Sequence, residues 1–170
     1  MALRADAARN RAAILAAASE AFAQHGPKAT TEQVAQQAGV AVGTVFRHFP
    51  TKDDLLIAIM KESLERLATL ANDSTLAEFF GAVADEAVRT RMVVTALGDS
   101  RLDIGDALRG LTDSVRQLLE RAKAAGEARP TVQVDEVMAL LTAATYAAQQ
   151  SSWTSDLRHR TLAVILRGLR

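Results

Sequence analysis

The 170-residue chain contains no cysteine, which excludes a disulfide framework, a thiolate zinc site, an iron–sulfur cluster and a cysteine nucleophile. Only 4% of its residues are aromatic and only three are proline, while alanine is abundant, and this mixture favours helices over sheets. Lysine and arginine together number 20, as do aspartate and glutamate, so the zero net charge argues against a protein that coats nucleic acid. With 49% hydrophobic and 24% charged residues, the composition is that of a folded globular chain.

The charge is unevenly distributed along the chain. Residues 1–52 carry a net charge of +3 and residues 53–170 a net charge of −3. A basic amino-terminal segment (the head, residues 1–52) on an acidic remainder (the body, residues 53–170) indicates a small module that faces an anion.

No segment of the sequence predicts membrane insertion. The uncharged run at residues 137–155 is nearly long enough to span a bilayer, but its threonine, glutamine and serine content favours a helix buried by protein. Residues 1–11 are charged and lack the apolar core of a signal peptide, so we expect a cytoplasmic protein with no membrane partner.

Apolar residues recur at spacings of three and four, which predicts an all-α fold of about nine helices. The expected N-caps are Thr30 (with Gln33), Thr51, Thr75 (with Glu78) and Asp135, and the expected stops are Gly39, Pro50 and Gly126. The helices are expected at residues 6–24, 31–39, 42–49, 52–71, 76–90, 92–98, 103–125, 135–152 and 156–169. We expect two domains, a domain of three helices over residues 1–52 and a longer helical domain over residues 53–170.

Three residues in the first domain have the spacing A-x3-G-x5-V, namely Ala35, Gly39 and Val45. A small Ala35 lets two helices approach closely, and Gly39 stands where the chain must turn with φ above zero. Val45 then packs the second helix onto the first. This pattern predicts a helix-turn-helix, whose second helix lies in the major groove of DNA.

The stretch AGVAVGTVFRHFPTKDDLL, together with preceding residues that include Ile14, Phe22 and Gly26, resembles the amino-terminal domain of the tetracycline-repressor (TetR) family of bacterial regulators. The resemblance covers about residues 10–57, and no motif beyond them identifies a ligand. It implies a sequence-specific DNA-binding transcriptional regulator, most simply a repressor that a small-molecule effector releases. It also implies a homodimer on a palindromic double-stranded operator.

The resemblance also assigns residues to DNA. Thr31 and Lys52 occupy positions that contact phosphate in the family. The recognition helix would present Val42, Gly43, Thr44, Phe46, Arg47 and His48. Arg47 is suited to a bidentate bond to guanine, with a phosphate contact or a solvated side chain as the alternatives, and Thr44 suits a thymine methyl or a phosphate.

Two further features of the head bear on DNA binding. Family members usually carry tyrosine where this chain has Phe46, so one phosphate hydrogen bond is missing. The amino-terminal Arg4, Arg9 and Arg11 are expected to reach phosphates or the minor groove, as arms do in related motifs.

The helical body offers candidates for an effector pocket and for a dimer interface. A small apolar effector is expected among Phe79, Phe80, Met92, Leu111, Tyr146 and Trp153, although the same residues are core candidates and a filled core is the alternative. The dimer interface is expected to include Leu141, Thr145, Leu162, Ile165, Leu166 and Leu169, because the last two helices are apolar on more faces than one protomer covers.

Other classes of protein find little support. The sequence has no G-x-S-x-G, G-x-G-x-x-G, G-x4-G-K-[ST] or H-E-x-x-H motif, so we expect no enzyme and no cofactor. His25 and His159 have no second ligand at metal spacing, and Asp99, Asp103 and Asp106 are interpreted as helix caps, so no metal is expected. A helical adaptor that binds protein remains the rival, and its binding would resist salt where DNA binding would not.

Overall fold

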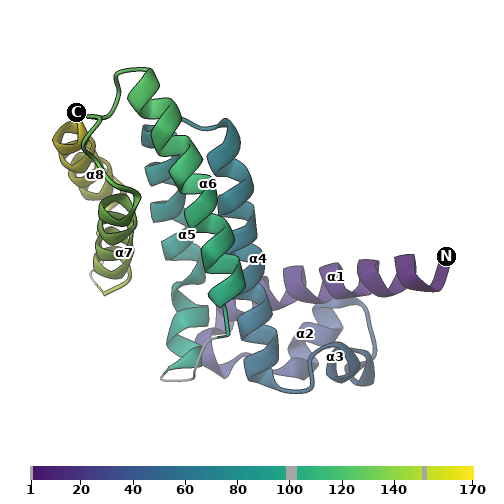
Figure 1. Cartoon of the computed structure of the whole chain (residues 1–170). Coiled ribbons are helices and arrows are strands. Elements are labelled where there is room, and N and C mark those ends of the chain that lie inside the picture. Colours follow the sequence, from purple (N-terminus) through teal and green to yellow (C-terminus); the bar gives the residue numbers. More distant parts are fainter. Residues whose placement is uncertain (1, 99–102, 151–152) are drawn as a thin grey trace. The chain divides into compact units, whose positions relative to one another are not determined.

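The computed structural model describes residues 2–98, 103–150 and 153–170, with side chains from Asp6 onward. Eight α-helices and one 3-10 turn make up the described chain, and no strand occurs among these residues, which confirms the all-α class (Figure 1). The elements are α1 (Ala2–His25), the turn η1 (Gly26–Lys28), α2 (Thr31–Ala38), α3 (Val42–His48), α4 (Lys52–Asp73), α5 (Leu76–Leu97), α6 (Gly105–Ala124), α7 (Val134–Gln150) and α8 (Ser155–Leu169). Within the described ranges, no helix is both long and apolar enough to cross a bilayer.

Most helix boundaries differ from the predicted ones by one to four residues, and two of the differences have a clear physical cause. The break expected between residues 90 and 92 is wrong, because α5 is continuous until Gly98 ends it with a φ of +54°. No proline or glycine interrupts the chain there, and Thr90 is buried. α7 begins before Asp135, and the backbone N–H of Gln133 donates instead to the Glu136 carboxylate at 2.7 Å. Asp99 and the expected end of α7 at residue 152 lie outside the described residues.

The chain forms two compact units. The first comprises described residues up to Glu62 and from Thr90 to Ile104, and the second comprises residues 63–89 and the described residues from Gly105 to Arg170. The first unit therefore continues past Lys52, where the sequence predicts that the DNA-binding domain ends. α4 and α5 each contribute residues to both units.

Each unit has its own apolar core. The core of the first unit joins α1 to the short helices and includes the end of α5, through Ile14, Leu15, Phe22, Val34, Ala35, Val45, Phe49, Leu55, Leu56, Ile59, Val93 and Leu97. The core of the second unit includes Leu67, Phe79, Phe80, Leu111, Val115, Leu118, Leu119, Val137, Leu141, Leu162 and Leu169. The first core holds the helix-turn-helix in a fixed frame.

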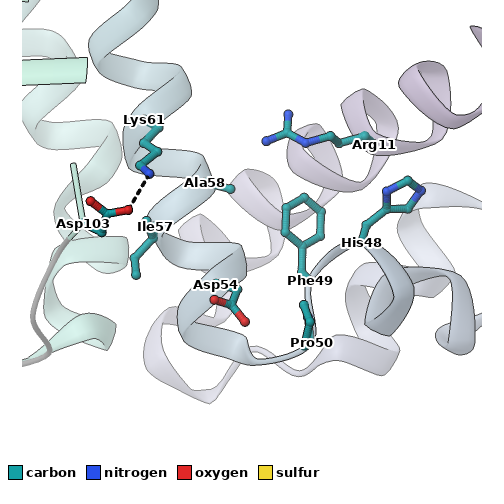
Figure 2. A pocket seen from close by; sticks show the side chains of 9 residues that line it. All are labelled: Arg11, His48, Phe49, Pro50, Asp54, Ile57, Ala58, Lys61 and Asp103. Carbon is teal, nitrogen blue, oxygen red and sulfur yellow. Dashed lines mark hydrogen bonds and ion pairs between the residues drawn. The ribbon is translucent and has the colours of Figure 1, made fainter. Parts of the chain in front are cut away.

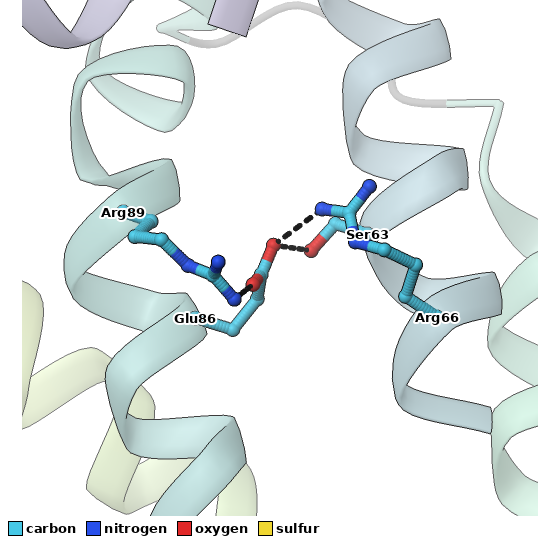
Figure 3. Close-up of polar contacts among 4 residues, drawn as sticks. All are labelled: Ser63, Arg66, Glu86 and Arg89. Carbon is cyan, nitrogen blue, oxygen red and sulfur yellow. Dashed lines mark hydrogen bonds and ion pairs between the residues drawn. The ribbon is translucent and has the colours of Figure 1, made fainter. Parts of the chain in front are cut away.

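The second unit also contains a buried polar cluster between α4 and α5 (Figure 3). The Glu86 side chain is only 6% exposed, and its carboxylate accepts hydrogen bonds from the Ser63 hydroxyl and from the guanidinium groups of Arg66, at 3.0 Å, and Arg89. A buried carboxylate without donors would be costly, so these three donors explain how the core tolerates Glu86. Nothing in the sequence pattern predicts this cluster.

Candidate nucleic-acid interface

Helix α2 is fixed at both ends by the residues that the sequence predicts. Thr30 and Gln33 form a reciprocal capping box, in which the Gln33 N–H donates to the Thr30 hydroxyl at 3.3 Å and the Thr30 N–H donates to the Gln33 side chain at 3.0 Å. Gly39 ends the helix in the left-handed region, with a φ of +66°. The N–H of Val40 then donates to the Ala35 carbonyl at 3.0 Å, which closes the turn before α3.

Burial of one residue decides which face of α3 points outward. Val45 is completely buried in the first core, while Gly43, Phe46 and Arg47 are exposed. Val42, Thr44 and His48 are half-buried at the edges of the same face. The helix ends where the Phe49 N–H donates to the Val45 carbonyl at 2.8 Å, just before Pro50.

The exposed face of α3 has features that suit contact with DNA. Phe46 is 44% exposed, so its ring is accessible to a partner. The Arg47 guanidinium has no hydrogen bond or ion pair among the described residues, so its five donors remain available. All six predicted recognition-helix residues therefore share one short helix with an open face.

The ammonium group of Lys52, which the resemblance assigns to phosphate, already has partners within the protein. Its Nζ donates to the carbonyls of Pro27 at 2.6 Å and Ala29 at 3.0 Å, and lies 5.3 Å from the centre of the Phe22 ring. These contacts tie the start of α4 to the loop before α2. Lys52 thereby helps to orient Thr31, the first residue of α2. Sequence reasoning missed this tie, because its partners are more than 20 residues away.

The amino-terminal arginines differ in their surroundings. Arg9 pairs with Asp6 on the same helix. Arg11 instead lies over the ring of Phe49, with its guanidinium carbon 5.5 Å from the ring centre. The Arg4 side chain lies outside the described residues.

A groove in the first unit runs past Arg11 and the end of the recognition helix (Figure 2). It has a volume of about 400 Å³ and is lined by Arg11, His48, Phe49, Pro50, Asp54, Ile57, Ala58, Lys61 and Asp103. Its acidic residues have partners: Asp103 pairs with Lys61 at 3.2 Å, and Asp54 accepts from the Thr51 hydroxyl at 2.7 Å. Arg11 is therefore the one cationic residue of the described lining without a carboxylate partner.

The residues predicted to bind an effector are dispersed. Phe79 and Phe80 are fully buried in the second core and Leu111 is nearly so, whereas Tyr146 is 65% exposed. Trp153 is half-buried in the second unit, and Met92 belongs to the first unit. None of the six lines the groove of Figure 2 or the smaller cavity of about 170 Å³ beside Arg121.

The predicted dimer residues fall into two groups. Leu141, Leu162 and Leu169 are buried in the core of the second unit, while Thr145, Ile165 and Leu166 are half-buried. On the same two helices, the large apolar residues Tyr146, Leu157 and Val164 are exposed.

A capped short helix, a left-handed glycine and a second helix with an open face together define a helix-turn-helix DNA-binding protein. Two models of protein families match the chain, and both agree with this class of protein. Residues 14–59 match the model of bacterial regulatory proteins of the tetR family, and residues 71–170 match the model of the C-terminal domain of SbtR-like transcriptional regulators. The chain belongs to the TetR family of transcriptional regulators, which are not enzymes.

Solved structures and curated relatives extend this result. The chain is 33% identical to a TetR transcription regulatory protein from Mycobacterium vanbaalenii, covering 99% of each chain with a TM-score of 0.71. It is 26% identical to the regulator SCO0520 from Streptomyces coelicolor, covering 94% of this chain and 98% of the other, with a TM-score of 0.72. It is also 39% identical over 66 residues to the HTH-type transcriptional repressor Rv1474c of Mycobacterium tuberculosis, a match over 38% of this chain and 35% of the relative. The matches span only about a third to a half of the first such curated repressors.

Proposed function

We propose that this regulator is a repressor that binds a roughly palindromic operator as a homodimer and that a small apolar effector releases. The observation that carries the DNA-binding part is the open face of α3, held by the caps of α2 and the buried Val45. A repressor acts where the chromosome lies, which in a bacterium is the cytoplasm.

The proposed DNA contacts divide by chemistry. Arg47 reads guanine through two parallel hydrogen bonds, and Thr44 contacts a thymine methyl or a phosphate. Thr31, His48 and Lys52 face phosphate, with Lys52 adding its charge from the position that its carbonyl partners fix. Val42, Gly43 and Phe46 complete the surface that meets the groove.

The dimer is proposed to form through α7 and α8. Tyr146, Leu157 and Val164 supply exposed apolar surface, and the half-buried Thr145, Ile165 and Leu166 line its edge. Two-fold pairing of these helices would cover that surface and present two recognition helices to one palindrome. Val164→Glu should yield monomers in sedimentation equilibrium, and an unchanged dimer would contradict this interface.

The effector is proposed to bind within the second unit, near Phe79, Phe80, Leu111, Tyr146 and Trp153. Because three of these residues pack in the core, a ligand must move them apart and thereby favour a different conformation. Such a change could reach the DNA-binding residues through α4, which begins at Lys52 and continues into the second unit. A coupling of about 1–3 kcal/mol is typical of such switches, and ligand and operator must weaken each other equally.

The experiment that tests the proposal is a fluorescence-anisotropy titration at two salt concentrations with a duplex that the wild-type protein selects from random sequences. We expect binding that falls steeply with salt, and Arg47→Ala should lose about 1–3 kcal/mol of discrimination at one base pair. Phe46→Tyr should tighten binding by supplying a phosphate donor. Failure to bind any duplex would instead favour a protein-docking module, and salt-sensitive binding without sequence preference would contradict the sequence-specific part of the proposal.

A further inference from the structure

We infer that Arg11 contacts the DNA backbone. Its guanidinium donates to a phosphate at the edge of the DNA major groove that the recognition helix α3 enters. The inference rests on the proposed DNA binding and assigns one further side chain to it, outside α2, α3 and the start of α4. It also distinguishes Arg11, which contacts phosphate, from the neighbouring Arg9, which pairs with Asp6.

The Phe49 ring fixes the position of Arg11. Phe49 is 4% exposed, and its backbone closes the end of α3 through the bond to Val45. The guanidinium carbon lies 5.5 Å from the centre of this buried ring, which is a favourable cation–π distance. Figure 2 shows Arg11 reaching from α1 toward the residues that follow α3, with His48 beside the same ring. A side chain held in this way loses little further freedom when it binds a ligand.

The charge of Arg11 is available for an anion. Among the described residues it has no carboxylate partner. The two acidic residues of the groove are committed elsewhere, Asp103 to Lys61 and Asp54 to the cap at Thr51. Neither carboxylate therefore pairs with the Arg11 guanidinium, which leaves its donors open to an external anion.

Phosphate suits this arrangement better than a base edge does. A planar guanidinium matches two phosphate oxygens in a bidentate pair. Arms that read the minor groove are extended segments, whereas the chain here is helical from Ala2 onward and Arg11 is anchored to Phe49. We therefore assign Arg11 to the sugar–phosphate backbone, where it contributes affinity without sequence preference.

Arg9 provides a matched control. It lies on the same helix only two residues away, is exposed, and is neutralised locally by Asp6. The test compares Arg11→Ala, Arg11→Lys and Arg9→Ala by anisotropy over a range of salt concentrations, on the selected duplex and on a random-sequence duplex.

For Arg11→Ala we expect affinity to fall on both duplexes, by about tenfold for each protomer bound, as for a lost charged hydrogen bond. The slope of log affinity against log salt should become shallower by about 0.9 for each protomer bound. Arg11→Lys should keep most of the slope, and Arg9→Ala should change the slope less than Arg11→Ala does, because Asp6 already pairs with Arg9.

Four results would overturn the inference. An unchanged salt slope for Arg11→Ala would show that Arg11 only packs on Phe49, and equal losses for Arg9→Ala would show a diffuse charge effect. A loss confined to one base pair would make Arg11 a base reader, and failure of the wild type to bind any duplex would defeat this inference and the proposed function together. A wild type that binds DNA without preference would defeat only the proposed sequence-specific function, because the random-sequence duplex still tests Arg11.

Discussion

The two compact units differ in what their cores leave for function. In the first unit, Val45 is buried in the core, while Gly43, Phe46 and Arg47 are exposed on the recognition helix α3. In the second unit, Phe79 and Phe80 are buried in the core, although they are among the residues predicted to line an effector pocket. The exposed face of a capped motif can thus be predicted from sequence, whereas apolar composition cannot distinguish residues that line a cavity from residues that fill it.

The units also differ in how their helices are stabilised. α2 and α3 have 8 and 7 residues, too few to be stable alone. α2 depends on its capping box and on Gly39, and both helices depend on burial. The helices that lie wholly in the second unit have 15 to 20 residues and depend mainly on packing. The buried Glu86 cluster, on the parts of α4 and α5 that belong to this unit, is a polar exception. The four predictions below test this contrast, from the largest expected effect to the smallest.

Glu86→Ala should destabilise the protein by about 3 kcal/mol. It leaves the buried Ser63 hydroxyl without its acceptor and removes the carboxylate that two arginines share. Urea denaturation measures the loss. Asp85→Ala is the control: Asp85 pairs with Arg158 at 3.2 Å but is 68% exposed, so its removal should cost about 1 kcal/mol or less. Equal losses in the two variants would show that the cluster contributes no more than a surface ion pair.

Gly39→Ala should cost about 1–2 kcal/mol, because a Cβ is disfavoured at a φ of +66° even though no atom lies within 4 Å of it. Gly126→Ala in the second unit is the matched variant, with a φ of +72° and the same open surroundings. The two should lose similar thermal stability, but only Gly39→Ala should weaken DNA binding, since its turn sets the direction of α3. Equal DNA affinities would contradict the role assigned to the turn.

Local signals in the sequence predicted much of this structure. The capping box of Thr30 and Gln33, the left-handed Gly39 and the bonds between Thr75 and Glu78 are all present as expected. Each of these features joins residues no more than four positions apart, so a single stretch of sequence contains the whole interaction.

Interactions between distant residues could not be predicted in the same way. Ser63 meets Glu86 across 23 positions, and Lys52 meets Pro27 across 25. The packing of Leu97 into the first core likewise depends on how α5 is placed by tertiary contacts. The same reason explains the missed continuity of α5, because burial of Thr90 overrides its modest helix propensity.

Lys52→Met should separate structural support from phosphate contact in the first unit. Loss of the bonds to the Pro27 and Ala29 carbonyls should lower the free energy of unfolding by about 1 kcal/mol. Lys61→Met is the control on the same helix, because its partner Asp103 is 91% exposed and the pair should contribute about 0.5 kcal/mol or less. A salt slope for DNA binding that also becomes shallower in Lys52→Met would support a phosphate contact. An unchanged slope would restrict Lys52 to positioning α2.

The smallest effect concerns one exposed carboxylate at a helix start in each unit. Hydrogen bonds from the Thr75 backbone N–H and hydroxyl hold the pKa of the Glu78 carboxyl below its ordinary value of 4.5. The pKa of Glu32 is lowered by its own backbone N–H and, secondarily, by the Thr30 side chain. A carboxyl whose pKa is lower in the folded state stabilises the protein above its unfolded pKa, and that stability is lost as pH falls through the folded value.

Glu78→Gln keeps the hydrogen-bond acceptor but removes the titration, so its melting temperature should fall less steeply than that of the wild type from about pH 5 to about pH 3. Glu32→Gln should flatten the same curve in the same direction, because the physical cause is a local hydrogen bond in both units. The two variants thus test whether the units share their helix-end chemistry although their cores differ. A steeper acid loss in either variant would show that its carboxylate is not stabilised in the folded state.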